Sequence, residues 1–165
     1  MITELIQKFQ LQPHPEGGWY TETYRSPVMI KQAALPDGFN GPRPLMTAIY
    51  FLLEQGNFSA FHRIKSDECW HFYAGQTLLV YVLGTEGRLT VTRLGHNMSA
   101  GEVFQYIVPA NHWFASEPAP DADFSFMGCT VSPGFEFSDF ELAASEQLIR
   151  EFPIYQALIS RLCRV

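Results

Sequence analysis

The sequence predicts an all-β protein with short helices at both ends, and three observations carry that prediction. Runs rich in aromatic and β-branched residues follow one another from residue 19 to residue 131. Clusters of Gly, Pro, Asn and Asp separate these runs at close intervals, as is typical of sandwiches and barrels. Aromatic residues make up 15% of the chain, enough to fill such an interior with large side chains. We therefore predict one domain, residues 1–165, built as a β-sandwich or β-barrel.

The composition excludes several classes of protein. A formal net charge of -6 and the absence of any Lys/Arg block argue against a nucleic-acid partner. The longest apolar run, Leu45–Leu53, is half the ~20 residues that a membrane helix needs, so no membrane association is expected. The three cysteines are too few and too scattered for a disulfide framework. Because the N-terminus also lacks the pattern of a signal peptide, we predict a cytoplasmic protein.

At the N-terminal end, Thr3–Gln10 has the apolar spacing of a short amphipathic helix. After two prolines and Gly17-Gly18, the segment Trp19–Arg25 alternates as an edge strand, with Tyr20 and Glu22 on the face opposite Arg25. The density of polar and aromatic residues from His14 to Arg25 equally indicates a ligand-facing segment. The segment Pro27–Pro44 holds four prolines and two glycines, which predicts a long surface loop.

The middle of the chain supplies the strands of the barrel, and its end is helical. The remaining predicted strands are Leu45–Glu54, a segment carrying His62, Glu68–Ala74, Thr77–Leu83, Arg88–Leu94, Val103–Val108, His112–Ser116 and Asp123–Val131. Ser138 and Glu141 match a capping box, which predicts a helix from there to about Phe152. A last helix is expected over Ile154–Cys163. We expect both helices to cover the outside of the barrel or a subunit contact.

The stretch Gly56–Gly75 contains the best candidates for a functional site. A strand with His62 and Ile64 on one face leads through a polar turn into a strand with Glu68, Trp70 and Phe72 on one face. If both faces point inward, a histidine and a carboxylate meet inside an aromatic cavity. A carboxylate is rarely buried without a partner, so Glu68 is a candidate for chemistry as well as for structure.

The spacing of this stretch resembles the first signature of the cupin superfamily, Gly-x5-His-x-His-x3-Glu-x6-Gly, with four defining residues present. The segments PHPEGGWYTETYRS, DECWHFYAG and SPGFEFSDFELA resemble the hallmarks of a small cupin branch described as predicted sugar-epimerase-like proteins. This wider resemblance covers nearly the whole chain. It implies a cupin-type double-stranded β-helix (a jelly-roll barrel) of two facing antiparallel sheets, usually a homodimer, with a pocket inside.

The chain departs from the metal-binding cupins at two positions. Those proteins hold the metal with two histidines and the glutamate of the first motif and a histidine of the second. Here Ile64 replaces one ligand, and the second-motif position falls on Phe114, with His112 two residues earlier at the same parity. A functional metal normally needs three or more protein ligands, and His62 and Glu68 supply two. The cofactor therefore stays open, since a divalent metal would lack two motif ligands.

The first functional hypothesis is an epimerase or isomerase acting on a sugar or nucleotide sugar. Its chemistry is proton abstraction next to a carbonyl, which needs a base tuned near neutral pH. Resemblance to the cupin-fold nucleotide-sugar epimerases assigns the base to His62 and the acid to a tyrosine, and Glu68 would orient the base. The lysine of those enzymes has no counterpart that we can place here. The catalytic candidates are thus His62 and Glu68.

The ligand-binding candidates are aromatic side chains and polar groups of the predicted strands. They are Tyr20, Glu22, Arg25, Trp70, Phe72, Tyr81, Tyr106 and His112. The three tyrosines are also candidates for the catalytic acid. The two histidines in loops, His14 and His96, are expected to lie in solvent.

Two other classes of function stay open. The second hypothesis is a non-catalytic cupin that binds a small molecule through aromatic walls and a few polar groups. The missing motif histidines favour it, because a binding protein tolerates a degraded metal site. The third is a metal-dependent cupin enzyme. Fold-level analogy does not decide among the three.

Overall fold

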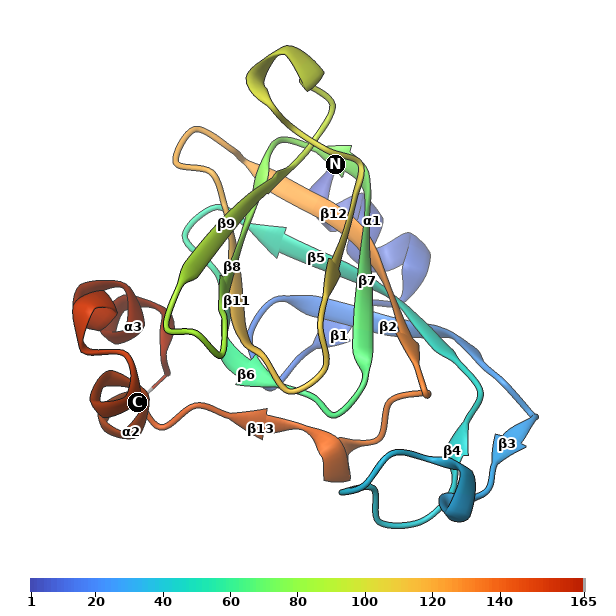
Figure 1. The fold of residues 1–165 in the computed structure, drawn as a ribbon. Coiled ribbons are helices and arrows are strands. Elements are labelled where there is room, and N and C mark those ends of the chain that lie inside the picture. Colours follow the sequence, from blue (N-terminus) through green and yellow to red (C-terminus); the bar gives the residue numbers. More distant parts are fainter. Residues whose placement is uncertain (165) are drawn as a thin grey trace.

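Two antiparallel sheets face each other and enclose the interior of a barrel in the computed structural model, which describes residues 1–164 (Figure 1). Strands far apart in the sequence lie side by side, as in a jelly roll. The predicted strands between residues 19 and 131 are all present, with ends that differ by a few residues. The prediction of an all-β jelly roll with short terminal helices is therefore confirmed.

The larger sheet contains six strands. In spatial order they are β1 (Gln12–Pro13), β2 (Trp19–Arg25), β5 (Thr47–Glu54), β12 (Phe124–Ser132), β7 (Asp67–Gly75) and β10 (Gln105–Val108). The smaller sheet contains, in order, β13 (Glu141–Leu142), β6 (Ser59–Arg63), β11 (Trp113–Pro118), β8 (Leu78–Leu83) and β9 (Leu89–Leu94). The predicted edge strand β2 thus has a two-residue strand, β1, outside it.

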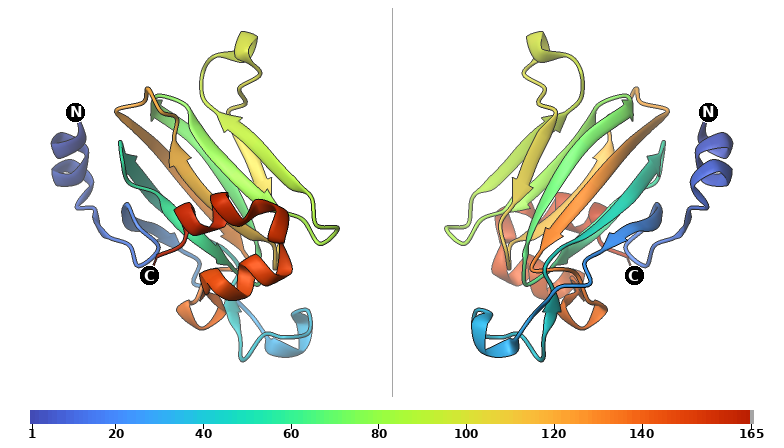
Figure 2. Two further views of the ribbon diagram at one scale, coloured as in Figure 1. Left: turned by 90° about the vertical axis from the view of Figure 1, so that its left-hand side faces the viewer. Right: turned by 90° about the vertical axis from the view of Figure 1, so that its right-hand side faces the viewer.

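The helices cover the outer faces of the two sheets. Helix α1 (Ile2–Phe9) places its apolar stripe on the outer face of the six-stranded sheet, against Leu52 and Phe126. Helices α2 (Ser145–Glu151) and α3 (Gln156–Leu162) pack together against the outer face of the five-stranded sheet, on the other side of the barrel from α1 (Figure 2). No helix of residues 1–164 is long and apolar enough to cross a bilayer.

The barrel interior is filled at one end and hollow at the other. Inward side chains from both sheets form a core that includes Phe72, Val80, Val82, Leu94 and Val108. Alternation along each strand directs these residues inward, as the sequence predicts. The hollow end is lined in part by the segment 133–140, which connects β12 to β13. We call this segment the cover segment.

The helix expected from Ser138 is wrong over its first half. Residues Phe137–Asp139 form a 3-10 turn, Glu141 and Leu142 form β13, and helix α2 begins only at Ser145. Strand β13 pairs with the free edge of β6, where Glu141 lies opposite Arg63 and ion-pairs with it at 2.8 Å. The pairing of β13 with β6, which is distant in the sequence, therefore overrides the helix that the capping box predicts.

The predicted loop Pro27–Pro44 contains more structure than expected. It forms a two-stranded sheet from β3 (Met29–Ile30) and β4 (Arg43–Pro44), joined through a short 3-10 turn. This segment lies beside the turn that precedes β13 (Figure 1). The contact is made by Arg43, whose Nε donates to Asp139 Oδ2 at 2.5 Å and whose Nη2 donates to Oδ1 at 2.7 Å. The loop therefore anchors the cover segment.

Candidate functional site

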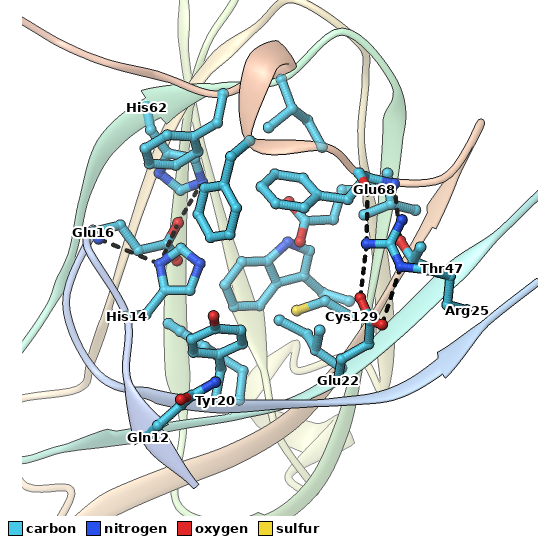
Figure 3. Close-up of a pocket in the computed structure, with 18 residues that line it drawn as sticks. Gln12, His14, Glu16, Tyr20, Glu22, Arg25, Thr47, His62, Glu68 and Cys129 are labelled. Atoms are coloured by element: carbon cyan, nitrogen blue, oxygen red, sulfur yellow. Dashed lines mark hydrogen bonds and ion pairs between the residues drawn. The ribbon is translucent and has the colours of Figure 1, made fainter. Parts of the chain in front are cut away.

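A cavity of about 280 Å³ occupies the hollow end of the barrel. Its polar lining comes from β1, β2, the turn between them, β5, β6, β7 and β12, and consists of Gln12, His14, Glu16, Glu22, Arg25, Thr47, His62, Glu68 and Cys129. Its apolar lining consists of Tyr20, Ile49, Phe51, Ile64, Trp70, Val131, Phe135, Phe137 and Phe140. The wall is thus rich in aromatic rings and holds several titratable groups (Figure 3).

Glycines at two consecutive positions bring His14 and Glu16 into this cavity. The turn between β1 and β2 has Gly17 at φ 116° and Gly18 at φ 74°, values that side-chain-bearing residues rarely adopt. A Cβ at Gly17 would lie 2.1 Å from the Phe58 carbonyl oxygen, and one at Gly18 would lie 2.7 Å from that of Leu52. The tight turn packs against the neighbouring strands and directs the two polar side chains inward.

Glu16 and His62 form a buried hydrogen-bonded pair. His62 Nδ1 lies 2.7 Å from the Ala60 carbonyl oxygen, which assigns the ring proton to Nδ1 and leaves Nε2 facing Glu16 Oε2 at 3.1 Å. Burial lowers the pKa of His62 to about 3, and burial together with the nearby Glu68 carboxylate raises the pKa of Glu16 well above 4.5. Burial thus favours the uncharged form of both groups, in which the Glu16 carboxyl donates its proton to His62 Nε2.

His14 completes this polar wall. Its Nδ1 accepts a hydrogen bond from the Glu16 backbone N–H at 3.3 Å and lies 3.5 Å from Glu16 Oε2, so its own proton sits on Nε2. Burial lowers the pKa of His14 to about 4. His14, Glu16 and His62 group on one side of the cavity (Figure 3). The expectation that His14 lies in solvent is therefore wrong, whereas His96 is exposed as expected.

Glu68 faces the cavity from β7 and is 8% exposed. Burial raises its pKa to about 7, and the Cys129 thiol and the Trp70 indole only partly offset this shift by favouring the charged form. The Trp70 N–H comes near this carboxylate without the geometry of a full hydrogen bond, and it has no other partner among residues 1–164. Glu68 also makes no ion pair with another described side chain. It is a titratable group poised near neutral pH.

A bulge in β2 places Arg25 at the rim of the same cavity. The register against β5 shifts between Glu22 and Tyr24, so Arg25 turns to the same face as Glu22, contrary to the simple alternation. Arg25 makes a two-point contact with Glu22, at 3.1 Å and 2.9 Å, and a further ion pair with Glu136 at 2.7 Å. Its charge is thus already matched by two carboxylates.

The cover segment closes the remaining side with three phenylalanines. The Phe140 ring lies 5.3 Å from the His62 ring, and the Phe137 ring stacks on His14 at 6.0 Å. The segment is fixed to β5 by a hydrogen bond of 2.9 Å from the Phe135 N–H to Thr47 Oγ1. The ligand-facing surface of the cavity is therefore aromatic on the side of the cover segment and polar on the side of the β1–β2 turn.

Comparison with known proteins identifies the family to which this barrel belongs. Residues 3–143 match the family described as Cupin superfamily (DUF985). The chain belongs to the cupin superfamily. A protein of Saccharomyces cerevisiae, Uncharacterized protein YML079W, is 29% identical over 161 residues, which cover 90% of this chain and 78% of that protein.

Solved cupin structures agree with the fold. Protein SO0799 from Shewanella oneidensis is 42% identical, with a TM-score of 0.85 over 98% of this chain and 96% of its own. A hypothetical protein from Leishmania major is 32% identical, with a TM-score of 0.88 over 99% of this chain and 98% of its own. Oxalate decarboxylase of Bacillus subtilis, at 16% identity and a TM-score of 0.54, covers 91% of this chain and 36% of its own, and this likeness shows the fold alone.

The side chains at the cupin metal position do not fit a resident metal. Ile64 lines the cavity where the motif has its second histidine, and Phe114 packs its ring 4.0 Å from that of His62. His62 already uses both ring nitrogens, on Ala60 and on Glu16. No group of three His, Cys, Asp or Glu side chains within residues 1–164 is arranged to hold a metal ion.

The structure brings six of the ten sequence-predicted site residues together in this cupin cavity. They are His62, Glu68, Tyr20, Glu22, Arg25 and Trp70. Four others lie elsewhere in the fold. Phe72 packs in the closed core, edge-on to His96, and Tyr106 packs beside that core. Tyr81 lies on the outer face of the five-stranded sheet, buried beneath the C-terminal helices, and donates a hydrogen bond to Glu117 at 2.8 Å. His112 lies in a loop, with Nδ1 3.0 Å from the Ala110 carbonyl oxygen.

Several cavity residues of this cupin were not among the predicted site residues. The most important are His14, Glu16, Cys129 and the three phenylalanines of the cover segment. The density of polar residues around PHPEGG was a sequence signal for a ligand-facing segment, but it did not indicate which side chains turn inward. Nothing local distinguishes Cys129 from an ordinary core cysteine.

Proposed function

We propose that this cupin binds a small carbonyl compound in the cavity and catalyses proton transfer next to the carbonyl, as a sugar epimerase or isomerase does. One observation carries the proposal: a single cavity holds two acid–base groups, the Glu16–His62 pair and Glu68. Epimerisation requires a base that removes a proton and an acid that returns one. A group whose pKa matches the working pH serves such chemistry best, and the pKa of Glu68 is about 7.

The geometry favours Glu68 as the base. The sequence-based hypothesis gave this role to His62, but His62 Nε2 faces Glu16 at 3.1 Å, so its lone pair is engaged. The Glu16–His62 pair holds a proton between its two members and is suited to act as the acid. Of the three candidate tyrosines, Tyr20 lines the cavity, where its hydroxyl is available to orient the ligand.

The size of the cavity favours a free monosaccharide over a nucleotide sugar. A volume of about 280 Å³ lies just below the roughly 300–1,000 Å³ of ligand pockets. A nucleotide sugar also carries a pyrophosphate, which needs cationic partners. Among residues 1–164, the one cation of the lining is Arg25, which is already paired with Glu22 and Glu136.

The test is exchange of substrate hydrogen with solvent deuterium. A panel of aldoses, ketoses and nucleotide sugars is incubated with the protein in heavy water, and the proton next to the carbonyl is followed by NMR. We expect exchange with a monosaccharide, and a loss of about 100-fold or more in Glu68→Gln, because a general base contributes roughly 10²–10⁴-fold. Glu141→Gln is the matched control, since Glu141 lies outside the cavity. Exchange that is undiminished in Glu68→Gln contradicts the proposal.

A second candidate function is ligand binding without turnover. The observation that favours it is the mutual engagement of Glu16 and His62, which leaves one free acid–base group in the lining. Binding of a panel compound without any deuterium exchange into it supports this alternative. A metal-dependent reaction is disfavoured because Ile64 and Phe114 stand at two ligand positions of the cupin motifs.

We also propose an oligomeric state and a cellular location for this cupin. A homodimer is proposed from the family resemblance, and a cytoplasmic location from the three scattered cysteines. Sedimentation equilibrium of the purified chain tests the first, and fractionation of cells that express it tests the second.

A further inference from the structure

The charged groups of the cavity do not balance. The lining contains three carboxyl groups, Glu16, Glu22 and Glu68, and one guanidinium, Arg25. Arg25 is matched by Glu22 at 2.9 Å and by Glu136 at 2.7 Å. The two histidines of the lining are kept neutral by burial, which lowers the pKa of each. Once Glu68 is ionised, the cavity carries a negative charge without a cationic partner among the described residues.

Aromatic rings surround this uncompensated charge. Six of them line the cavity: Tyr20, Phe51, Trp70, Phe135, Phe137 and Phe140. The face of an aromatic ring carries partial negative charge and attracts ammonium groups, most strongly where water is excluded. The Trp70 side chain belongs to this wall and is 1% exposed, and Glu68 is 8% exposed, so both are largely withdrawn from bulk solvent. A cavity of this kind stabilises a compact cation better than a neutral or anionic group.

We propose that the ligand of this cavity carries a small ammonium group, held between the aromatic rings and the Glu68 carboxylate. This inference rests on the proposed function in taking this cavity as the ligand site, and it deepens that function by naming the charge of the ligand. It also bears on the chemistry: a cation beside Glu68 lowers the pKa of its carboxyl group. The base is then ionised in the complex at neutral pH.

The groups around Glu68 determine how binding depends on pH. Glu16 from the β1–β2 turn, His62 from β6, Cys129 from β12, and Glu22 and Arg25 from β2 face the same cavity. Arg25 stays charged, and the pKa values of His62, about 3, and Cys129, well above 9, keep both neutral between pH 5.5 and 8. Ionisation of Glu68 near pH 7, or of Glu16, adds negative charge as the pH rises. The affinity for a cation therefore increases with pH.

Choline and 3,3-dimethylbutan-1-ol provide a direct test because they share one shape and differ in charge. Their affinities for the full chain are measured by titration calorimetry at pH 8 and pH 5.5. We expect choline to bind at least about tenfold more tightly than the alcohol at pH 8, and the ratio to fall to about threefold at pH 5.5. In Glu68→Gln the ratio should approach one at pH 8 while the alcohol still binds, which shows that the cavity is intact. Glu141→Gln should match the wild type.

Three results would overturn the proposal: equal affinity for the two compounds at pH 8, no detectable binding of choline, or a preference that Glu68→Gln retains. The experiment measures binding alone, so it separates this inference from the proposed function. Deuterium exchange with neutral monosaccharides and no preference for choline would overturn the charge of the ligand only. A preference for choline with no exchange in any compound would overturn proton transfer only.

Discussion

Asp139 and Glu68 are both buried carboxylates in this cupin, but only Asp139 has a cationic partner among residues 1–164. Asp139, in the cover segment, receives two hydrogen bonds from the Arg43 guanidinium, and the two side chains are each 3% exposed. Glu68, in the cavity wall, is no more exposed than 8% and has two uncharged neighbours, Cys129 and Trp70. One carboxylate is neutralised within the fold, and the other is not.

The difference separates structure from function. A buried carboxylate with a two-point arginine partner fixes the position of a segment, here the one that carries three cavity phenylalanines. A buried carboxylate without a cation costs free energy at neutral pH, and that cost is typical of groups kept for binding or catalysis. A buried carboxylate in this fold therefore has a structural role when a cation is paired with it, and a functional role when none is.

The largest effect is expected from breaking the Arg43–Asp139 pair. Asp139→Ala leaves a buried guanidinium without its partner, which costs about 3–5 kcal/mol of unfolding free energy. Urea unfolding measures the loss. The double variant Arg43→Met, Asp139→Ala removes both charges and should recover a large part of it, because apolar replacement of a buried ion pair is often near neutral. A loss under 1 kcal/mol in Asp139→Ala would place this pair with the weak surface pairs.

Glu68→Gln should change stability in the other direction, and only at high pH. The pKa of Glu68 in the folded state, about 7, lies above the ordinary 4.5, so folding favours the protonated form. That contribution is complete below pH 4.5 and is lost as the pH rises to 7. At about 1.4 kcal/mol per pKa unit, the wild type loses about 3 kcal/mol by pH 8.

Because glutamine cannot ionise, Glu68→Gln should be more stable than the wild type by about 3 kcal/mol at pH 8 and equally stable at pH 4. Urea unfolding at the two pH values tests this. Glu141→Gln, in the exposed ion pair with Arg63, is the control for the pH series. A stability difference between Glu68→Gln and wild type that does not vary with pH would show that Glu68 has an ordinary pKa.

The smallest effect is expected at the rim. Arg25 and Glu136 are 38% and 42% exposed, and exposed ion pairs contribute about 0–1 kcal/mol. Glu136→Gln should therefore lower the unfolding free energy by under about 1 kcal/mol, and less still in 0.5 M salt, which screens surface charges. A loss as large as that of Asp139→Ala would mean that the rim pair stabilises the cover segment as much as the buried pair does.

The sequence alone determined most of the barrel and the core of the candidate site. Alternation of side chains along a strand is a local property, so Trp19–Arg25 and the strand with Glu68, Trp70 and Phe72 could be predicted from neighbouring residues. The same local rule placed His62 and Glu68 on inward faces, and the structure has both in one cavity. The amphipathic spacing likewise sufficed for the N-terminal helix.

Only the tertiary structure decided which other side chains join His62 and Glu68 in the cavity. His14 and Glu16 face inward because Gly17 packs against the Phe58 carbonyl just before β6 and Gly18 against the Leu52 carbonyl of β5. Arg25 joins them because β2 bulges against β5. Residues 141–142 form a strand and not a helix because the edge of β6, about 80 positions earlier in the chain, is free to pair. Each of these outcomes depends on a contact between distant segments, whereas periodicity and capping signals report only on residues a few positions apart.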